Sequence, residues 1–108
     1  MRVLLIIRLP NKAFNVAVRD GTAGAKTRTI LEETKPEAVW FREMKGQRTV
    51  VIITEVDRPA SIPRLAEPWF LTFNAKVEFH AVMGLEELQE AGLDGLGKKW
   101  GYALQTRR

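Results

Sequence analysis

The chain has 108 residues, of which 45% are hydrophobic and 28% charged, and its formal net charge is +4. This length suits one domain, and the composition is typical of a folded globular protein rather than a disordered one. The sequence contains no cysteine, which excludes disulfides, thiolate metal ligands and cysteine nucleophiles.

The first predicted element is a strand at Arg2–Leu9, a short run of apolar and mostly branched residues. Successive apolar positions indicate a strand that is buried on both faces. The run is too short to cross a membrane, which needs about 20 apolar residues, and it lacks the cleavage site of a secretory signal. We therefore expect a soluble, cytoplasmic protein.

A helical pattern follows, from Asn11, a candidate N-cap, towards Pro36. Gly21 and Gly24 each weaken a helix by about 1 kcal/mol relative to alanine, so we expect a break there or close packing on the sheet. The segment Gly21–Thr27 superficially resembles a phosphate-binding loop, but its glycine spacing is wrong for that motif. We interpret it as a weakened helix.

A β-hairpin is predicted next. Glu37–Met44 alternates between its two faces, as a half-buried strand does. Residues 45–47 form a tight connection to Thr49–Val56, a second run that is apolar on both faces. Two such runs separated by a short turn favour antiparallel pairing.

A second helix is predicted after the proline-rich loop Asp57–Pro63, because apolar residues recur at every third or fourth position as far as Phe73. Pro68 is expected to kink this helix or to divide it into two turns. Asn74 is expected to end it in a left-handed conformation. The alternating segment Ala75–Met83 predicts a fourth strand.

Two short helical stretches, Leu85–Ala91 and Leu93–Trp100, complete the chain. We expect one domain over residues 1–108, with residues 1–83 as its core and residues 84–108 as a C-terminal helical extension. The order β-α-β-β-α-β predicts an α+β fold, the antiparallel ferredoxin-like sandwich with right-handed crossovers. In that arrangement the first and third strands are central, which agrees with their apolar residues on both faces.

The two helices can cover only one face of this sheet. The side chains expected to point towards them are Val3, Leu5, Ile7, Val39, Phe41, Val77 and Phe79. The opposite face would expose Leu4, Ile6, Trp40, Val51, Ile53 and Val82. Soluble monomers rarely expose such a patch, and burying about 500 Å² of it could contribute on the order of 10 kcal/mol before the costs of association. We therefore expect a homodimer in which two sheets cover each other.

The element order, the doubly apolar central strands and the added C-terminal helices resemble the dimeric α+β barrel superfamily. The resemblance is one of topology over residues 1 to about 83, without a diagnostic motif. It implies a bacterial protein of a superfamily that includes cofactor-independent monooxygenases and muconolactone isomerases. A shared fold of this kind supports many functions.

His80 is the only histidine and lies two residues from Glu78, on the same face of the fourth predicted strand. A histidine oriented by a carboxylate can act as a general base near neutral pH, so both are catalytic candidates. The alternative is an edge-strand histidine with a charged neighbour and no catalytic role. We favour this alternative.

A second candidate site joins Arg8, Trp40 and Arg42 on the same face as His80. Two guanidinium groups beside an aromatic wall could bind a small anion or an aromatic acid. Alternatively, Arg42 pairs with Glu55 across the hairpin, which would contribute less than about 1 kcal/mol. We favour the pairing.

Other classes of function are less well supported. A single histidine without cysteine cannot complete a transition-metal site, and the 17 basic residues are spread among 13 acidic ones rather than gathered into a nucleic-acid surface. We expect no metal, no cofactor, no nucleic-acid partner and no membrane partner. Two hypotheses are favoured over a third, a regulatory or nucleic-acid-associated module. They are a homodimer that binds a small organic ligand, and a cofactor-independent monooxygenase or isomerase acting on a small organic acid.

Overall fold

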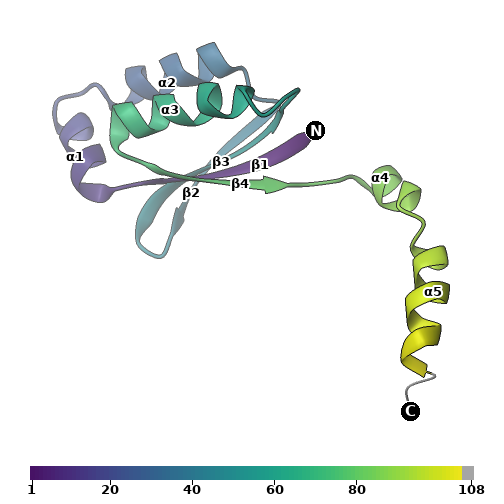
Figure 1. Cartoon of the computed structure of the whole chain (residues 1–108). Helices are drawn as coiled ribbons and strands as arrows, with labels where there is room; N and C mark the ends of the chain where they lie inside the picture. The colour runs from purple at the N-terminus through teal and green to yellow at the C-terminus, as the bar shows by residue number, and fades with distance from the viewer. Residues whose placement is uncertain (106–108) are drawn as a thin grey trace.

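The protein is an α+β fold, seen in a computed structural model that describes residues 1–105 (Figure 1). The last three residues of the predicted extension, 106–108, lie outside the described residues. The strands are β1 (Arg2–Leu9), β2 (Ala38–Met44), β3 (Gln47–Glu55) and β4 (Lys76–Ala81). The helices in this range are α1 (Asn11–Arg19), α2 (Ala23–Thr34), α3 (Ser61–Phe73), α4 (Leu85–Glu90) and α5 (Leu93–Gln105).

The strands form one antiparallel sheet in the order β2-β3-β1-β4. β1 and β3 therefore have a hydrogen-bonded neighbour on each side, while β2 and β4 form the edges. Central strands bury both faces more fully than edge strands do, which explains why the two doubly apolar runs lie in the centre. The architecture is consistent with the ferredoxin-like sandwich expected from the element order.

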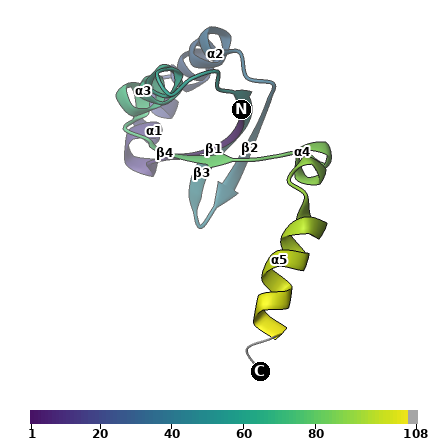
Figure 2. The same ribbon diagram turned by 45° about the vertical axis from the view of Figure 1, so that its right-hand side comes forward.

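Helices α1, α2 and α3 lie on one side of the sheet, and the core fills the space between the two layers (Figures 1 and 2). Trp69 and Phe73 of α3 are the largest fully buried side chains. The ring of Phe73 also lies 5.0 Å from that of Phe14, centroid to centroid, which joins α1 to α3. The main core side chains from the sheet are those of Val3, Leu5, Ile7, Val50 and Ile52.

The first helical region is divided at Gly21, one of the two glycines at which a break was expected, whereas Gly24 lies within α2. α1 ends at Arg19, and Gly21 adopts a positive φ of 80° before α2 begins. The predicted N-cap role of Asn11 is wrong: Pro10 is the cap residue, and no side chain caps the helix. The Asn11 amide instead donates a hydrogen bond to the carbonyl of Gly46, which ties the start of α1 to the β2–β3 turn.

Of the two outcomes expected at Pro68, a kink or a division, the division is wrong, because α3 is continuous from Ser61 to Phe73. Pro68 has no N–H to donate to the preceding turn. Burial of Leu65, Trp69 and Phe73 against the sheet holds the helix together across this gap. Asn74 ends α3 in the left-handed conformation, with φ 55°, and this prediction is confirmed.

The segment after β4, residues 83–105, extends away from the sheet and its helices (Figures 1 and 2). We call it the C-terminal arm. β4 ends at Ala81, two residues before the predicted end of the strand at Met83. None of the helices in residues 1–105 is both long enough and apolar enough to cross a membrane.

Candidate functional site

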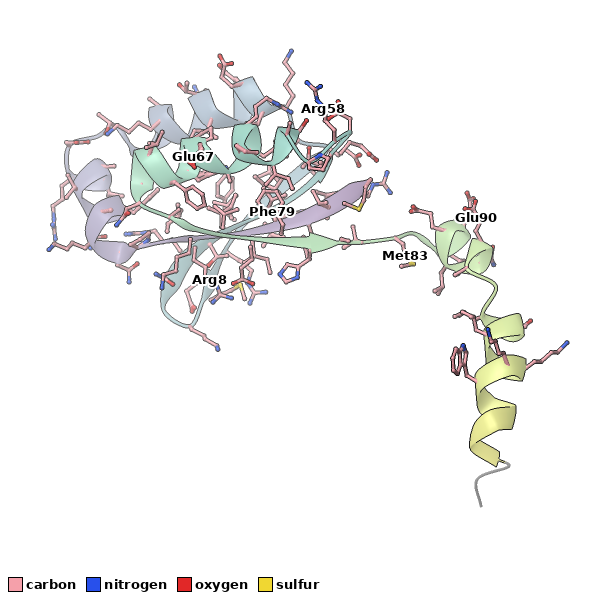
Figure 3. All side chains as sticks on the ribbon, viewed as in Figure 1. Arg8, Arg58, Glu67, Phe79, Met83 and Glu90 are labelled. Atoms are coloured by element: carbon pink, nitrogen blue, oxygen red, sulfur yellow. The ribbon has the colours of Figure 1, made fainter. Side chains whose placement is uncertain are left out.

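The sheet face that points away from the helices is largely apolar, and we call it the open face. Figure 3 shows Arg8 on this face and Phe79 between the sheet and the helices. Along β1 the burial alternates, so that Leu5 and Ile7 are buried while Leu4 and Ile6 are only half-buried. Of the side chains assigned to the open face, Leu4, Ile6, Trp40, Val51 and Ile53 share it by strand register, whereas Val82 lies beyond the end of β4.

The catalytic candidates His80 and Glu78 contact each other on the open face of β4. The Nε2 atom of His80 lies 3.2 Å from one carboxylate oxygen of Glu78, and the Arg8 Nε donates to the other oxygen at 3.0 Å. The hydrogen bond with His80, aided by the nearby Arg8 charge, holds the pKa of Glu78 below its ordinary value. Both His80 and Glu78 are more than two-fifths exposed, so the cluster is a surface feature of the single chain.

The ligand-binding candidates share the open face but lie on two strands. Arg8 is on the central strand β1, where it pairs with Glu78, whereas Trp40 and Arg42 are on the edge strand β2. Arg8 and Arg42 are both in register with Thr49 of β3, so two strand spacings, about 10 Å, separate their backbones. The favoured pairing of Arg42 with Glu55 is wrong, because the register sets Arg42 opposite Thr49 and Glu55 opposite Arg2.

We expect that replacing Glu78 by Gln, or His80 by Ala, lowers the melting temperature only slightly at about pH 7, because both side chains are exposed. The folded pKa of Glu78 is lowered, so its contribution is present above the ordinary value of 4.5 and is lost as the pH falls through the lowered one. Melting curves of E78Q and the natural chain should therefore converge under acid. Curves that diverge would contradict this ion-pair assignment.

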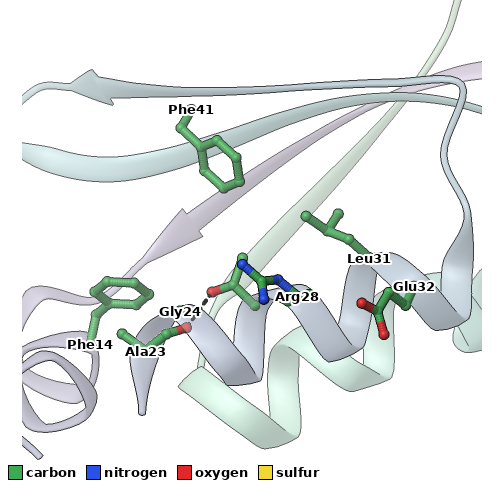
Figure 4. Close-up of a pocket in the computed structure, with 8 residues that line it drawn as sticks. Phe14, Ala23, Gly24, Arg28, Leu31, Glu32 and Phe41 are labelled. Atoms are coloured by element: carbon green, nitrogen blue, oxygen red, sulfur yellow. Dashed lines mark hydrogen bonds between the residues drawn. The ribbon is translucent and has the colours of Figure 1, made fainter. Parts of the chain in front are cut away.

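A cleft opens on the other side of the sheet, between α2 and the edge strand β2 (Figure 4). Its volume is about 570 Å³, which is within the usual range for small-molecule sites. Phe14, Leu31 and Phe41 provide most of its apolar wall. The complete lining comprises Phe14, Ala23, Gly24, Thr27, Arg28, Leu31, Glu32 and Phe41.

Two opposite charges lie at the cleft, Arg28 and Glu32, one helical turn apart on α2. The Thr27 hydroxyl is already engaged, because it donates to the carbonyl of Ala23 at 2.8 Å. Within residues 1–105, Arg28 takes part in none of the ion pairs or side-chain hydrogen bonds. Its guanidinium group therefore keeps its donors available for a bound carboxylate.

A smaller hollow of about 370 Å³ adjoins the cleft and shares Phe14, Thr27 and Phe41 with it. Arg48 lies here, but its guanidinium group is occupied: it donates to Asn15 at 2.7 Å and lies 5.0 Å from the centre of the Phe14 ring. This contact holds the Phe14 ring in the wall of the cleft. Arg48 therefore positions the aromatic wall and leaves Arg28 as the cation at the cleft.

The cleft was not among the sites expected from the sequence. Phe41 points to the helix side, as expected, yet 61% of its surface is exposed because no helix covers the outer edge of β2. An exposed phenylalanine at a position assigned to the core is the signal that marks the cleft. The sequence pattern gives the face of Phe41 but not the extent of the helix layer above it.

No group of three histidine, aspartate or glutamate side chains that could hold a metal ion occurs within the described part of the chain. Comparison with models of known protein families finds no match, and comparison with curated protein sequences finds no relative. The candidate sites are therefore inferred from the geometry of the structure alone.

Proposed function

We propose that the protein is a homodimer that binds a small organic acid in the cleft between α2 and β2. The observation that carries this proposal is the combination of an apolar, partly aromatic wall with a single unpaired guanidinium group, that of Arg28. An apolar cavity with few polar groups is the common form of a small-molecule site. The polar groups then determine which ligands it accepts.

The wall favours a flat, apolar ligand body. Phe14 and Phe41 lie on either side of the cleft, and Leu31 contributes a third apolar surface (Figure 4). Aromatic rings stack on or contact other rings at modest entropic cost. A carboxylate on the ligand would meet Arg28, while Glu32 would repel a second acidic group placed close to it. The chemistry thus favours an aromatic or alicyclic monoacid.

Binding of 2-naphthoate, compared with its neutral analogue 2-naphthalenemethanol, tests the proposal by isothermal titration calorimetry. We expect the acid to bind, and the alcohol to bind at least about tenfold more weakly, because it lacks the charge-assisted contact with Arg28. R28L should remove this preference. R64L is the matched control, because Arg64 is also exposed but lies on α3, outside the cleft. This change should leave the preference for the acid intact.

A second variant tests the location of the ligand. A side chain at Gly24 would meet no atom within 4 Å at its Cβ, so G24L fits the helix and fills part of the cleft. We expect G24L to weaken binding of 2-naphthoate and to keep the fold. Equal affinities in G24L, R28L and the natural chain would place any binding elsewhere and overturn the proposal.

The homodimer is proposed from the open face. Leu4, Ile6, Val51 and Ile53 form a half-buried apolar centre there, with the exposed Trp40 at its margin. A second sheet placed on it by a two-fold axis would cover this surface with its own equivalent, because such an interface is self-complementary. This is also the assembly implied by the resemblance to the dimeric α+β barrel superfamily.

The second candidate function is the cofactor-independent enzyme, and the contacts around Glu78 are the observation that favours it. His80 and Arg8 both bind this carboxylate, so the orientation of the imidazole is fixed by a charged neighbour. In the proposed dimer, the open face that carries this cluster is enclosed. A general base at such a position would act on a substrate held between the two sheets.

A further inference from the structure

The C-terminal arm leaves the molecule as an extended projection (Figures 1 and 2). The radius of gyration is 19.2 Å, whereas a compact domain of this length has a radius of about 13 Å. The backbone N–H of Val82 still bonds to the carbonyl of Arg2, so the chain remains in line with β4 until the arm begins. The arm therefore points outward along the strand direction, away from the core.

The arm carries an apolar stripe that is exposed within the described part of the chain. On α5, Leu93, Leu96 and Trp100 recur at helical spacing on one side and are 54%, 45% and 62% exposed. Leu85 and Leu88 continue the apolar surface onto α4 and are also exposed. Exposed apolar surface that is arranged on one side of a helix indicates an interaction site.

The α5 helix also needs a partner for its own stability. It has 13 residues, three of them glycines, and projects away from the sheet and from helices α1–α3 (Figures 1 and 2). Isolated helices of this length are marginal in water, and each glycine costs about 1 kcal/mol relative to alanine. A helix with these properties forms when its apolar side packs against another surface.

We propose that the arm of each protomer packs on the margin of the open face of a second copy of the chain, beside the sheet-to-sheet contact, so that two arms are exchanged in the dimer. The inference rests on the proposed homodimer and adds to it the segment that crosses between protomers. Reciprocal exchange of one element is a common route to closed two-fold dimers. It would cover the stripe on each arm and the margins of each sheet together.

Charge complementarity selects a second copy as the occupant. The helix α4 is acidic, with Glu86, Glu87 and Glu90 among its six residues. The open face has basic side chains at its margins, including Arg42 on β2 and Lys76 on β4. Acidic α4 would meet Arg42 at the β2 margin of the partner's open face, while Leu93, Leu96 and Trp100 would meet the exposed Trp40 at the same margin. Complementary charge fixes the orientation of such contacts.

Energy transfer between fluorophores tests the exchange, and the absence of native cysteine allows single labelled positions. A donor is attached to D94C on the arm of one preparation and an acceptor to E33C on α2 of another. We expect efficient transfer after the two are mixed. A chain with both labels, diluted into excess unlabelled protein, should show weak transfer, because its own arm lies on an unlabelled partner.

Arm variants provide the second readout. The double change L93E/L96E places two charges on the apolar stripe. Sedimentation equilibrium should show a dimer dissociation constant at least about tenfold higher than that of the natural chain. K98E, on the polar side of α5, is the matched control and should leave the dimer unchanged. Strong transfer within a chain, or an unaffected L93E/L96E dimer, overturns the exchange and leaves the sheet-to-sheet dimer standing. A monomeric natural chain overturns both.

Discussion

Replacing Ile6 by Lys is expected to convert the protein from a dimer to a monomer, with the dissociation constant raised at least about a hundredfold. Ile6 lies on the central strand β1 and faces the open side of the sheet, next to Val51 of β3. In a sheet-to-sheet dimer an ammonium group at this position would be enclosed beside apolar side chains. Its cross-strand neighbour on β4, Glu78, is already engaged by Arg8 and His80. In a monomer the same group reaches water, because Ile6 is only half-buried within the single chain.

Sedimentation equilibrium of I6K over a range of concentrations measures this effect, and circular dichroism establishes that the variant remains folded. L71K is the matched control: Leu71 is on α3, is 81% exposed, and lies on the other side of the molecule from the open face. We expect L71K to dimerise like the natural chain. A folded I6K protein that dimerises with unchanged affinity would exclude the open face as the interface.

The second prediction with a large effect concerns the core side chains that support the aromatic wall of the cleft. Replacing Trp69 by Ala is expected to lower the free energy of unfolding by about 3–5 kcal/mol, which is a large part of the 5–15 kcal/mol typical of a whole domain. Trp69 is only 1% exposed, and its ring lies 6.3 Å from that of Phe73. Phe73 in turn contacts Phe14, so the cavity left by the indole would loosen the wall of the cleft.

Urea denaturation of W69A followed by circular dichroism measures the loss. L71A, two residues away on the exposed side of α3, should stay within about 0.5 kcal/mol of the natural chain. The W69A protein should also bind 2-naphthoate more weakly, because Phe14 loses the support of Phe73. A loss of stability similar to that of L71A would show that α3 does not pack on the sheet through Trp69.

The strands and their faces could be predicted from the sequence because they depend on local periodicity. Side chains alternate strictly along a strand, so the pattern of Arg2–Leu9 gives both the strand and the division of its residues between two faces. The end of α3 at Asn74 is likewise a local property of its left-handed conformation. Pro68 is the exception, since long-range burial of the helix outweighs its local preference.

The candidate sites could not be predicted in the same way, because they depend on distances between residues of different elements, which the periodicity of the sequence does not give. Lys45 and Gly46 both have positive φ and form a two-residue turn, so Met44 pairs with Gln47. That register alone separates Arg42 from Glu55. Predicting the register requires knowledge of the turn type and not only of the presence of a turn. The cleft at Phe41 depends on how far α1 and α2 lie from the outer edge of β2, which packing between distant residues determines.

The strand order also has a consequence for how the chain folds as it is synthesised. β1 is made first, yet both of its neighbours come much later, with β4 completed only at Ala81. Pairing of strands that are distant in the chain is slow, because the intervening segment must lose conformational entropy before any stabilising contact forms. Until then the apolar side chains of β1 stay uncovered, which exposes this strand to aggregation.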